Sequence, residues 1–243
     1  MKKSKQRNLF SIKINKNIDK YIGDINSIID SQIPKTKKIK NKDLPKYVYK
    51  CQKEINLKKK KLIIFKLIKK ELINEFKSSK FVVSDFILRY VQKDKVMKPI
   101  ILHQEKFYGD ESWDNIYNLW IPIRNNFKSN SINYIKNSNK FILNRDFIIE
   151  EKKTKYKKKS YFHKIGMLYN EKRIHFLKKF KLEKLFEKDK IMIFDGNLIH
   201  GNGVNNYNSP RISLDLRFML KKHLKHNRIS TSTGKKYFSY INL

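Results

Sequence analysis

The stretch Arg211-Ile212-Ser213-Leu214-Asp215-Leu216-Arg217-Phe218 alternates polar and apolar residues without interruption. This period of two predicts a β-strand with one polar and one apolar face. The apolar face can pack beneath helices, and the polar face must then point into the interior of a barrel. A guanidinium buried there needs an anionic partner, so Arg211 beside Ser213 suits the carboxylate of a ligand.

The sequence before this strand divides into a helical part and a strand-rich part. Apolar residues at a three-to-four spacing predict a helix over Ile18–Ile33, and a Lys-rich region over Leu44–Phe76 is expected to form two more helices. Further strands are predicted at Phe81–Val91, Pro99–Glu105, Tyr117–Ile123, Lys140–Glu150, Lys190–Asp195 and Arg211–Leu220. This order predicts an α+β chain whose core is an antiparallel barrel or sandwich.

The segments between the predicted strands are mostly expected to be loops. Asn125–Asn139 and Lys152–Lys159 are rich in Asn, Ser and Lys, and the second is interpreted as a solvated loop or a lid over the site. Lys172–Phe186 is interpreted as a short inserted helix. No segment is polar enough to divide the 243 residues, so we expect a single domain with a helical layer over 1–80, a core over 81–220 and a basic tail over 221–243.

Two histidines and one carboxylate are the strongest candidates for chemistry. His103 and Glu105 follow a short apolar run, and residues i and i+2 of a strand share a face. His200 follows the apolar strand Ile191–Phe194, at the start of a Gly- and Asn-rich turn. Two histidines and a carboxylate form the facial triad that holds non-heme Fe(II) and leaves other positions open. These three residues are therefore our candidate metal ligands.

The order His103-x-Glu105, His200, Arg211-x-Ser213 resembles the motifs of the Fe(II)/2-oxoglutarate-dependent dioxygenases. Within that family the chain is most similar to the phytanoyl-CoA dioxygenase-like superfamily. The run from His200 to Phe218 resembles the streptomycin-biosynthesis type of oxygenase from carbohydrate gene clusters. Leu119-Trp120-Ile121-Pro122-Ile123 also resembles the strand that follows the first metal motif there. The resemblance covers residues 81–220.

This resemblance implies a double-stranded β-helix, the jelly-roll fold of cupins, with the N-terminal helices packed on its major sheet. It implies that His103, Glu105 and His200 bind Fe(II), and that Arg211 pairs with the distal carboxylate of 2-oxoglutarate with support from Ser213. With O2, such an enzyme hydroxylates or otherwise oxidises a small molecule. The carbohydrate-cluster oxygenases imply a sugar or a carbohydrate-biosynthesis intermediate, an anionic sugar derivative included.

Two details of the same sequence bear on this site. The family more often has Asp where this chain has Glu105, and the extra methylene moves the carboxylate outward. Asn118 shares a strand face with Trp120, and we interpret it as polar packing, with a contact to the cosubstrate as the alternative.

Charge is the most unusual feature of the composition. Lys and Arg number 57 against 22 Asp and Glu, which gives a net charge of +35 and invites an anionic partner such as nucleic acid. Only eight of the 57 are Arg, the residue that proteins prefer for bidentate contacts to bases and phosphates. We therefore interpret the lysines as a solvated surface and do not expect a nucleic-acid partner. The sequence does not indicate an oligomeric state.

Several protein classes are excluded by what the sequence lacks. The single cysteine, Cys51, excludes a disulfide framework and a Cys-rich zinc module. No run reaches the roughly 18–20 apolar residues of a membrane helix. The basic N-terminus has no apolar segment of the kind that follows in a secretion signal, so a cytoplasmic protein is expected.

Two alternatives to the oxygenase hypothesis stay open. One is a catalytically inactive basic barrel that binds a polyanion such as nucleic acid. The other is a metal-dependent cupin of another class, such as an isomerase, that uses the same three candidate ligands without 2-oxoglutarate. Only the oxygenase needs the guanidinium of Arg211 inside the barrel.

Overall fold

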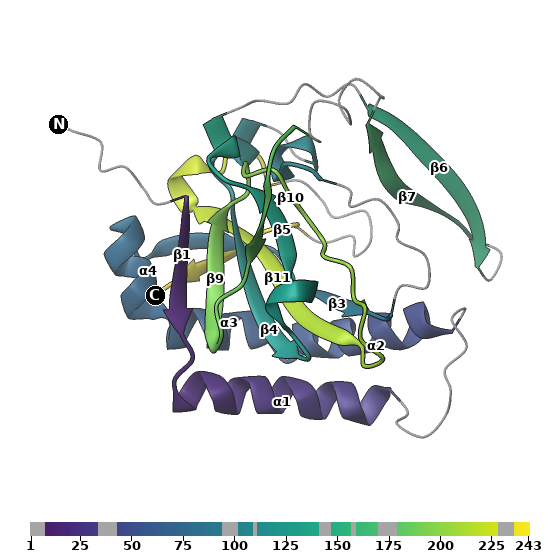
Figure 1. Ribbon diagram of the computed structural model, residues 1–243. Helices are drawn as coiled ribbons and strands as arrows, with labels where there is room; N and C mark the ends of the chain where they lie inside the picture. The colour runs from purple at the N-terminus through teal and green to yellow at the C-terminus, as the bar shows by residue number, and fades with distance from the viewer. Residues whose placement is uncertain are drawn as a thin grey trace.

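The computed structural model describes residues 8–33, 43–93, 102–108, 111–140, 147–156, 159–169, 179–227 and 236–243. Over these ranges the chain combines helices with antiparallel sheets (Figure 1). None of the helices in these ranges is both long and apolar enough to cross a membrane.

Four helices lie in the N-terminal part of the chain. Helix α1 spans Lys16–Gln32, and the side chain of Asn15 caps it by accepting hydrogen bonds from two backbone N–H groups of the first turn. The predicted helix over Ile18–Ile33 is thus confirmed. The region Leu44–Phe76 forms three helices rather than the expected two: α2 (Leu44–Leu57), α3 (Lys60–Leu67) and α4 (Lys69–Phe76). Lys59 interrupts the series in the left-handed conformation, with φ of 51°.

A seven-stranded antiparallel sheet forms the largest layer of the molecule. Its strand order is β1-β9-β4-β11-β2-β12, and β3 pairs with the other half of β11, beside β2. The bounds of its strands are β1 Leu9–Lys13, β2 Lys80–Val83, β3 Ile87–Val91, β4 Tyr117–Arg124, β9 Lys190–Asp195, β11 Arg211–Leu220 and β12 Ser239–Asn242.

Strand β11 has the two faces that its alternating sequence predicts. Ile212, Leu214, Leu216 and Phe218 belong to one apolar cluster with residues of all four helices, so the helices cover this face of the sheet. The polar residues alternate with them and point to the opposite face. Strand β11 therefore separates the helix-covered core from the side of the sheet that carries the candidate site.

A second, smaller sheet lies on that opposite face. It consists of β10 (His200–Gly201), β5 (Ile132–Ile135) and β8 (Leu182–Leu185) in this order. A second apolar cluster joins it to the large sheet, with members from β4, β9, β5 and β8: Trp120, Met192, Phe194, Ile132, Tyr134 and Leu185. The helices, the large sheet and the small sheet thus form three successive layers.

Two predicted loops and one predicted helix are wrong. The segment Asn125–Asn139 contains β5, because Ile132 and Tyr134 are buried against the large sheet. Of the segment Lys152–Lys159, residues 152–156 lie in strand β6 (Phe147–Tyr156) and Lys159 begins its partner β7 (Lys159–Tyr169), whereas residues 157–158 lie outside the described part. The helix proposed over Lys172–Phe186 is replaced in its described part by β8, since pairing with β5 overrides the local helical spacing.

The boundaries of other predicted strands also change. Phe81–Val91 forms two strands, β2 and β3, instead of one. Of Pro99–Glu105, residues 99–101 lie outside the described part, and the remainder forms a single bridge at His103 followed by a 3-10 turn over Glu105–Tyr108. Strand β6 starts at Phe147, later than the predicted Lys140, and residues 141–146 lie outside the described part. The tail over 221–243 contributes β12 to the large sheet.

Candidate metal centre

His103 and His200 are joined by their backbones. The N–H of His103 donates to the carbonyl of His200 at 2.8 Å, and the N–H of His200 donates back at 2.9 Å. This isolated antiparallel bridge fixes the two residues opposite each other, so their side chains lie on the same side. The imidazole centroids are 4.5 Å apart.

Glu105 is brought to the same point by the turn that precedes His200. Its N–H donates to the carbonyl of Gly196 at 2.7 Å, and Gly196 in turn donates to the carbonyl of Ile116 at 2.8 Å. A methyl group on Gly196 would lie 2.5 Å from Cγ2 of Ile116 and 3.1 Å from Cβ of Glu105. Glycine is therefore required for this close approach, which the sequence did not reveal.

The three candidate ligands converge on a single point. Oε1 of Glu105 lies 3.6 Å from Nε2 of His200 and 3.9 Å from Nε2 of His103. One ligand atom from each residue can be chosen so that all three lie within 4.8 Å of one another. Glu105 and His200 are buried, and His103 is half-buried. These are donor types that bind a divalent metal ion, and the structure gathers them in one place.

The orientation of His200 favours a cation between these atoms. Its Nδ1 lies 2.8 Å from the carbonyl oxygen of Leu198, which can only accept, so Nδ1 carries the proton of that hydrogen bond. In the neutral imidazole, Nε2 then presents a lone pair toward the carboxylate of Glu105. Either a proton on Nε2 or a metal cation between the two atoms makes this contact favourable, and a backbone-oriented histidine is a common arrangement at metal ions.

A buried arginine balances the charge of Glu105. Nη2 of Arg217 donates to Oε1 of Glu105 at 2.9 Å, and both side chains are at least nine-tenths buried. Burial raises the pKa of the Glu105 carboxyl, but Arg217, His200 and His103 together outweigh it and hold that pKa well below its ordinary value. Glu105 is therefore ionised, as a metal ligand must be. Its other oxygen, Oε2, is buried and accepts no hydrogen bond from any described residue.

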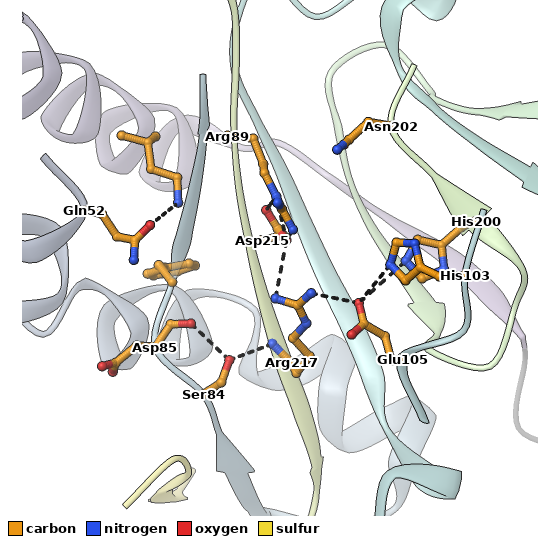
Figure 2. A network of polar contacts seen from close by, with 12 residues as sticks. Gln52, Ser84, Asp85, Arg89, His103, Glu105, His200, Asn202, Asp215 and Arg217 are labelled. Atoms are coloured by element: carbon orange, nitrogen blue, oxygen red, sulfur yellow. Dashed lines mark hydrogen bonds and ion pairs between the residues drawn. The ribbon is translucent and has the colours of Figure 1, made fainter. Parts of the chain in front are cut away.

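The ion pair continues along β11 toward β3. Nη1 of Arg217 lies 3.7 Å from Oδ2 of Asp215, and Arg89 binds the Asp215 carboxylate with two nitrogens, at 3.0 and 3.1 Å. Figure 2 shows these residues as a continuous row that ends at the two histidines. The alternation of β11 placed Asp215 and Arg217 on the polar face, but nothing in the sequence pointed to Arg89 or to the pairing of Arg217 with Glu105.

A cavity of about 30 Å³ adjoins the three candidate ligands. Polar side chains supply much of its wall, namely Arg89, Asn118, Asn202 and Asp215, and Trp120 contributes an aromatic surface. The amide group of Asn118 is buried, and neither its oxygen nor its nitrogen has a hydrogen-bond partner among the described residues. A buried carboxamide without partners beside a cavity can bind a ligand or a water molecule that enters it. A volume of this size holds about one water molecule.

Arg211 and Ser213 are fully buried, as the alternation of β11 predicted, but they do not line this cavity. Arg211 donates from Nη1 to the carbonyl of Asn130 at 2.7 Å and from Nη2 to the side-chain oxygen of Asn202 at 3.4 Å. Burial lowers the pKa of Arg211 to about 10. The carboxylate of Asp215 acts against this decrease, and the guanidinium of Arg89 adds to it. Within the described ranges, Nε of Arg211 and Oγ of Ser213 have no hydrogen-bond partner. Asn202 thus separates a buried, incompletely paired guanidinium from the cavity.

Comparisons with known proteins yield only distant structural likeness. No protein-family model and no curated protein matches the chain. Among solved structures, it is similar to AviO1 from Streptomyces viridochromogenes Tue57, with 12% identity over 58% of this chain and 52% of that chain and a TM-score of 0.38. It is also similar to EctD from S. alaskensis with 2-oxoglutarate and 5-hydroxyectoine, with 15% identity over 62% and 48% and a TM-score of 0.42.

A third similar structure is the epimerase SnoN in complex with Fe3+, alpha ketoglutarate and nogalamycin RO. The identity is 8% over 88% of this chain and 79% of that chain, with a TM-score of 0.48. The chain spans about half the length of AviO1 and of EctD. At these identities and TM-scores the likeness adds nothing to the chemistry of the site, which rests on the geometry of this chain.

Proposed function

We propose that this protein is a non-heme oxygenase that depends on Fe(II) and 2-oxoglutarate and that hydroxylates or otherwise oxidises a small molecule. The observation that carries the proposal is the convergence of Nε2 of His103, Nε2 of His200 and Oε1 of Glu105 on one buried point. The backbone contact of His200 leaves its Nε2 available for an ion. We also propose that the two antiparallel sheets form the jelly roll that the sequence motifs imply.

In this proposal His103, Glu105 and His200 are both the iron ligands and the catalytic centre. These three donors would hold the iron and leave room on it for the cosubstrate. Iron held there would supply the oxidising chemistry, at the expense of 2-oxoglutarate, which would be converted to succinate and CO2. The protein fixes the ligands, keeps Glu105 ionised through Arg217 and excludes bulk water from the buried site.

We assign the distal carboxylate of 2-oxoglutarate to Arg211 and Ser213. Their buried and unpaired polar atoms support this assignment, because a carboxylate would satisfy both. The cavity is smaller than a 2-oxo acid, and Asn202 occupies the space between it and Arg211. Binding therefore requires the side chain of Asn202 to break its 3.4 Å hydrogen bond with Nη2 of Arg211, and the carboxylate then accepts from Nη2 instead. The unpaired amide of Asn118 is the second group that the cosubstrate would complete.

For the substrate we propose a polar small molecule, with a sugar or a carbohydrate-biosynthesis intermediate as the preferred class. The support is the lining of the cavity, in which Arg89, Asp215 and Asn202 offer donors and acceptors beside the ring of Trp120. Hydroxyl-rich molecules are recognised by this combination of polar side chains and an aromatic face. An anionic carrier group on the substrate is compatible with the net charge of +35.

Succinate release tests the proposal directly. Protein purified without oxygen is given Fe(II), ascorbate and 2-oxoglutarate, and succinate is measured with and without candidate sugars. We expect slow uncoupled turnover that disappears in His200→Ala. Metal binding without any turnover of 2-oxoglutarate would instead support a metal-dependent cupin of another class. No metal binding together with tight, salt-sensitive binding of DNA would support the inactive polyanion-binding barrel.

The single oxygenase domain and the cytoplasmic location are part of the same proposal. Both stay predictions from the sequence.

A further inference from the structure

The contact between Arg217 and Glu105 fixes the orientation of the carboxylate beside the two imidazoles. Glu105 reaches the two imidazoles through a side chain with three rotatable bonds, which a metal centre has to hold in one orientation. Nη2 of Arg217 lies 2.9 Å from Oε1, the oxygen that also lies nearest to both histidines. A carboxylate oxygen has two lone pairs, so Oε1 can accept a hydrogen bond from Arg217 with one and bind an ion with the other.

Arg217 is itself held in place from both ends. Its backbone N–H donates to Oγ of Ser84 at 2.9 Å, and its carbonyl accepts from the N–H of Ser84 at 2.8 Å. Its guanidinium lies against Asp215, which Arg89 binds with two of its nitrogens. Figure 2 shows Ser84 on one side of Arg217 and the Arg89–Asp215 pair on the other. Arg217 is thus a buried donor with a fixed backbone rather than a surface cation.

We propose that Arg217 is the positioning residue of the metal centre, which holds Glu105 so that it binds the ion through Oε1 alone. This inference rests on the proposed metal site. Its consequence is the number of open positions, because a carboxylate that chelates with both oxygens occupies one position more. Three open positions are needed for a two-atom cosubstrate and O2, so a Glu105 free to chelate would block the reaction while still binding the metal.

Manganese supplies the test, because bound Mn(II) reports its own water ligands through the relaxation of water protons. The dissociation constant of Mn(II) and the number of exchangeable waters are measured without oxygen for wild type, Arg217→Lys and Arg217→Met. In Arg217→Met we expect binding that is about 10- to 100-fold weaker, the usual effect of removing a group that orients a ligand. In both variants we expect the bound ion to carry one water fewer, since Met offers no donor and Lys offers no rigid planar group to hold Oε1 as Nη2 of Arg217 does.

Two controls separate positioning from a general structural role. Arg124→Lys and Arg124→Met change an arginine of the same sheet that pairs with Asp30 at 2.9 Å and does not line the cavity. These variants are expected to keep the wild-type water count. Glu105→Asp shortens the carboxylate, and combining it with Arg217→Met should cost less affinity than the two changes add up to, because the second change then removes a contact already lost.

The outcomes are distinct for the two proposals. An Arg217→Lys protein that matches wild type in both affinity and water count overturns the positioning role, even if Arg217→Met does not fold. Wild-type protein that binds no divalent ion overturns the proposed function and this inference together. Wild-type binding with full 2-oxoglutarate turnover in Arg217→Lys, at an unchanged water count, overturns this inference and leaves the proposed function intact.

Discussion

His103 and His200 lie far apart in the chain, yet each donates its backbone N–H to the carbonyl of the other, at 2.8 and 2.9 Å. The imidazoles therefore do not depend on side-chain contacts alone for their placement. The bridge is made by backbone groups and uses none of the candidate donor atoms, so the affinity for a divalent ion should be limited by the donors rather than by ordering the chain.

The first prediction concerns metal content. Wild-type protein loaded with Fe(II) without oxygen is expected to retain about one ion per chain, and His200→Ala to lose it, because two donors hold a divalent ion far less tightly than three. The measurement is elemental analysis after desalting. His226→Ala removes an exposed histidine that is not one of the three candidate ligands. It is the matched control and should retain the ion. Equal iron in His200→Ala and wild type would contradict the assignment.

The second prediction concerns the pH dependence of stability in the metal-free protein. The pKa of Glu105 is lowered in the folded state from an ordinary value of 4.5, so ionised Glu105 stabilises the fold above that pH. This contribution should be lost as the pH falls below about 4.5 toward the folded-state pKa. The measurement is denaturant unfolding from pH 7 downward.

Glu105→Gln is the control for that titration. It should lack this part of the pH dependence and be less stable at pH 7 by about 3–5 kcal/mol, since it leaves Arg217 buried without its charge partner. A variant with the same acid transition and the same stability as wild type would show that the buried pair does not contribute.

A third prediction concerns the cosubstrate. Arg211→Lys should weaken the binding of 2-oxoglutarate to the Mn(II)-loaded protein by about 10-fold or more, because hydrogen bonds to a charged group are worth about 1.5–3 kcal/mol. Calorimetric titration measures this. Ser213→Ala should have a smaller effect of the same sign, and Arg124→Lys none. Unchanged binding in Arg211→Lys would place the carboxylate elsewhere.

A fourth prediction concerns the turn that presents Glu105. Gly196→Ala would force a methyl group against Ile116 and Cβ of Glu105, so it should destabilise the protein by about 1–3 kcal/mol and weaken metal binding as well. Gly23→Ala is the opposite case, since nothing lies within 4 Å of the added methyl on α1. That change should stabilise the helix by roughly 0.5–1 kcal/mol. Thermal unfolding of the two variants measures both effects, and a tolerated Gly196→Ala would contradict the tight packing.

The parts of the fold that could be predicted from the sequence are those that follow from a regular spacing of apolar residues along the chain. The apolar spacing of α1 and the alternation of β11 depend on neighbours in the chain, and both elements lie where they were expected. Strands β1, β5 and β12 were missed because each has only four or five residues and depends on pairing with β9, with β8 and β10, and with β2. Such pairing over long separations leaves little local signal.

The candidate site divides in the same way. The three metal-ligand candidates were predicted from their residue types and from the resemblance of the ordered set, with Arg211-x-Ser213, to known motifs, and the structure brings the three together. Arg217 was placed correctly on the polar face of β11, but its partner Glu105 could not be predicted, since an ion pair across a fold has no pattern in the chain. Arg89 gave no signal at all: it is an isolated charge within an apolar strand, and its role appears only through Asp215.

The two opposite faces of β11 also bear on how the chain avoids misfolding. If β11 slipped by one residue against β4, Arg211, Asp215 and Arg217 would be forced beneath the helices, and four apolar side chains would face the polar cavity. Burying three charges among aliphatic side chains is far more costly than any gain from an alternative pairing. The residues that we assign to ligand binding therefore also exclude the wrong alignment of the central strand, and neutral replacements at these positions should make aggregation during refolding more frequent.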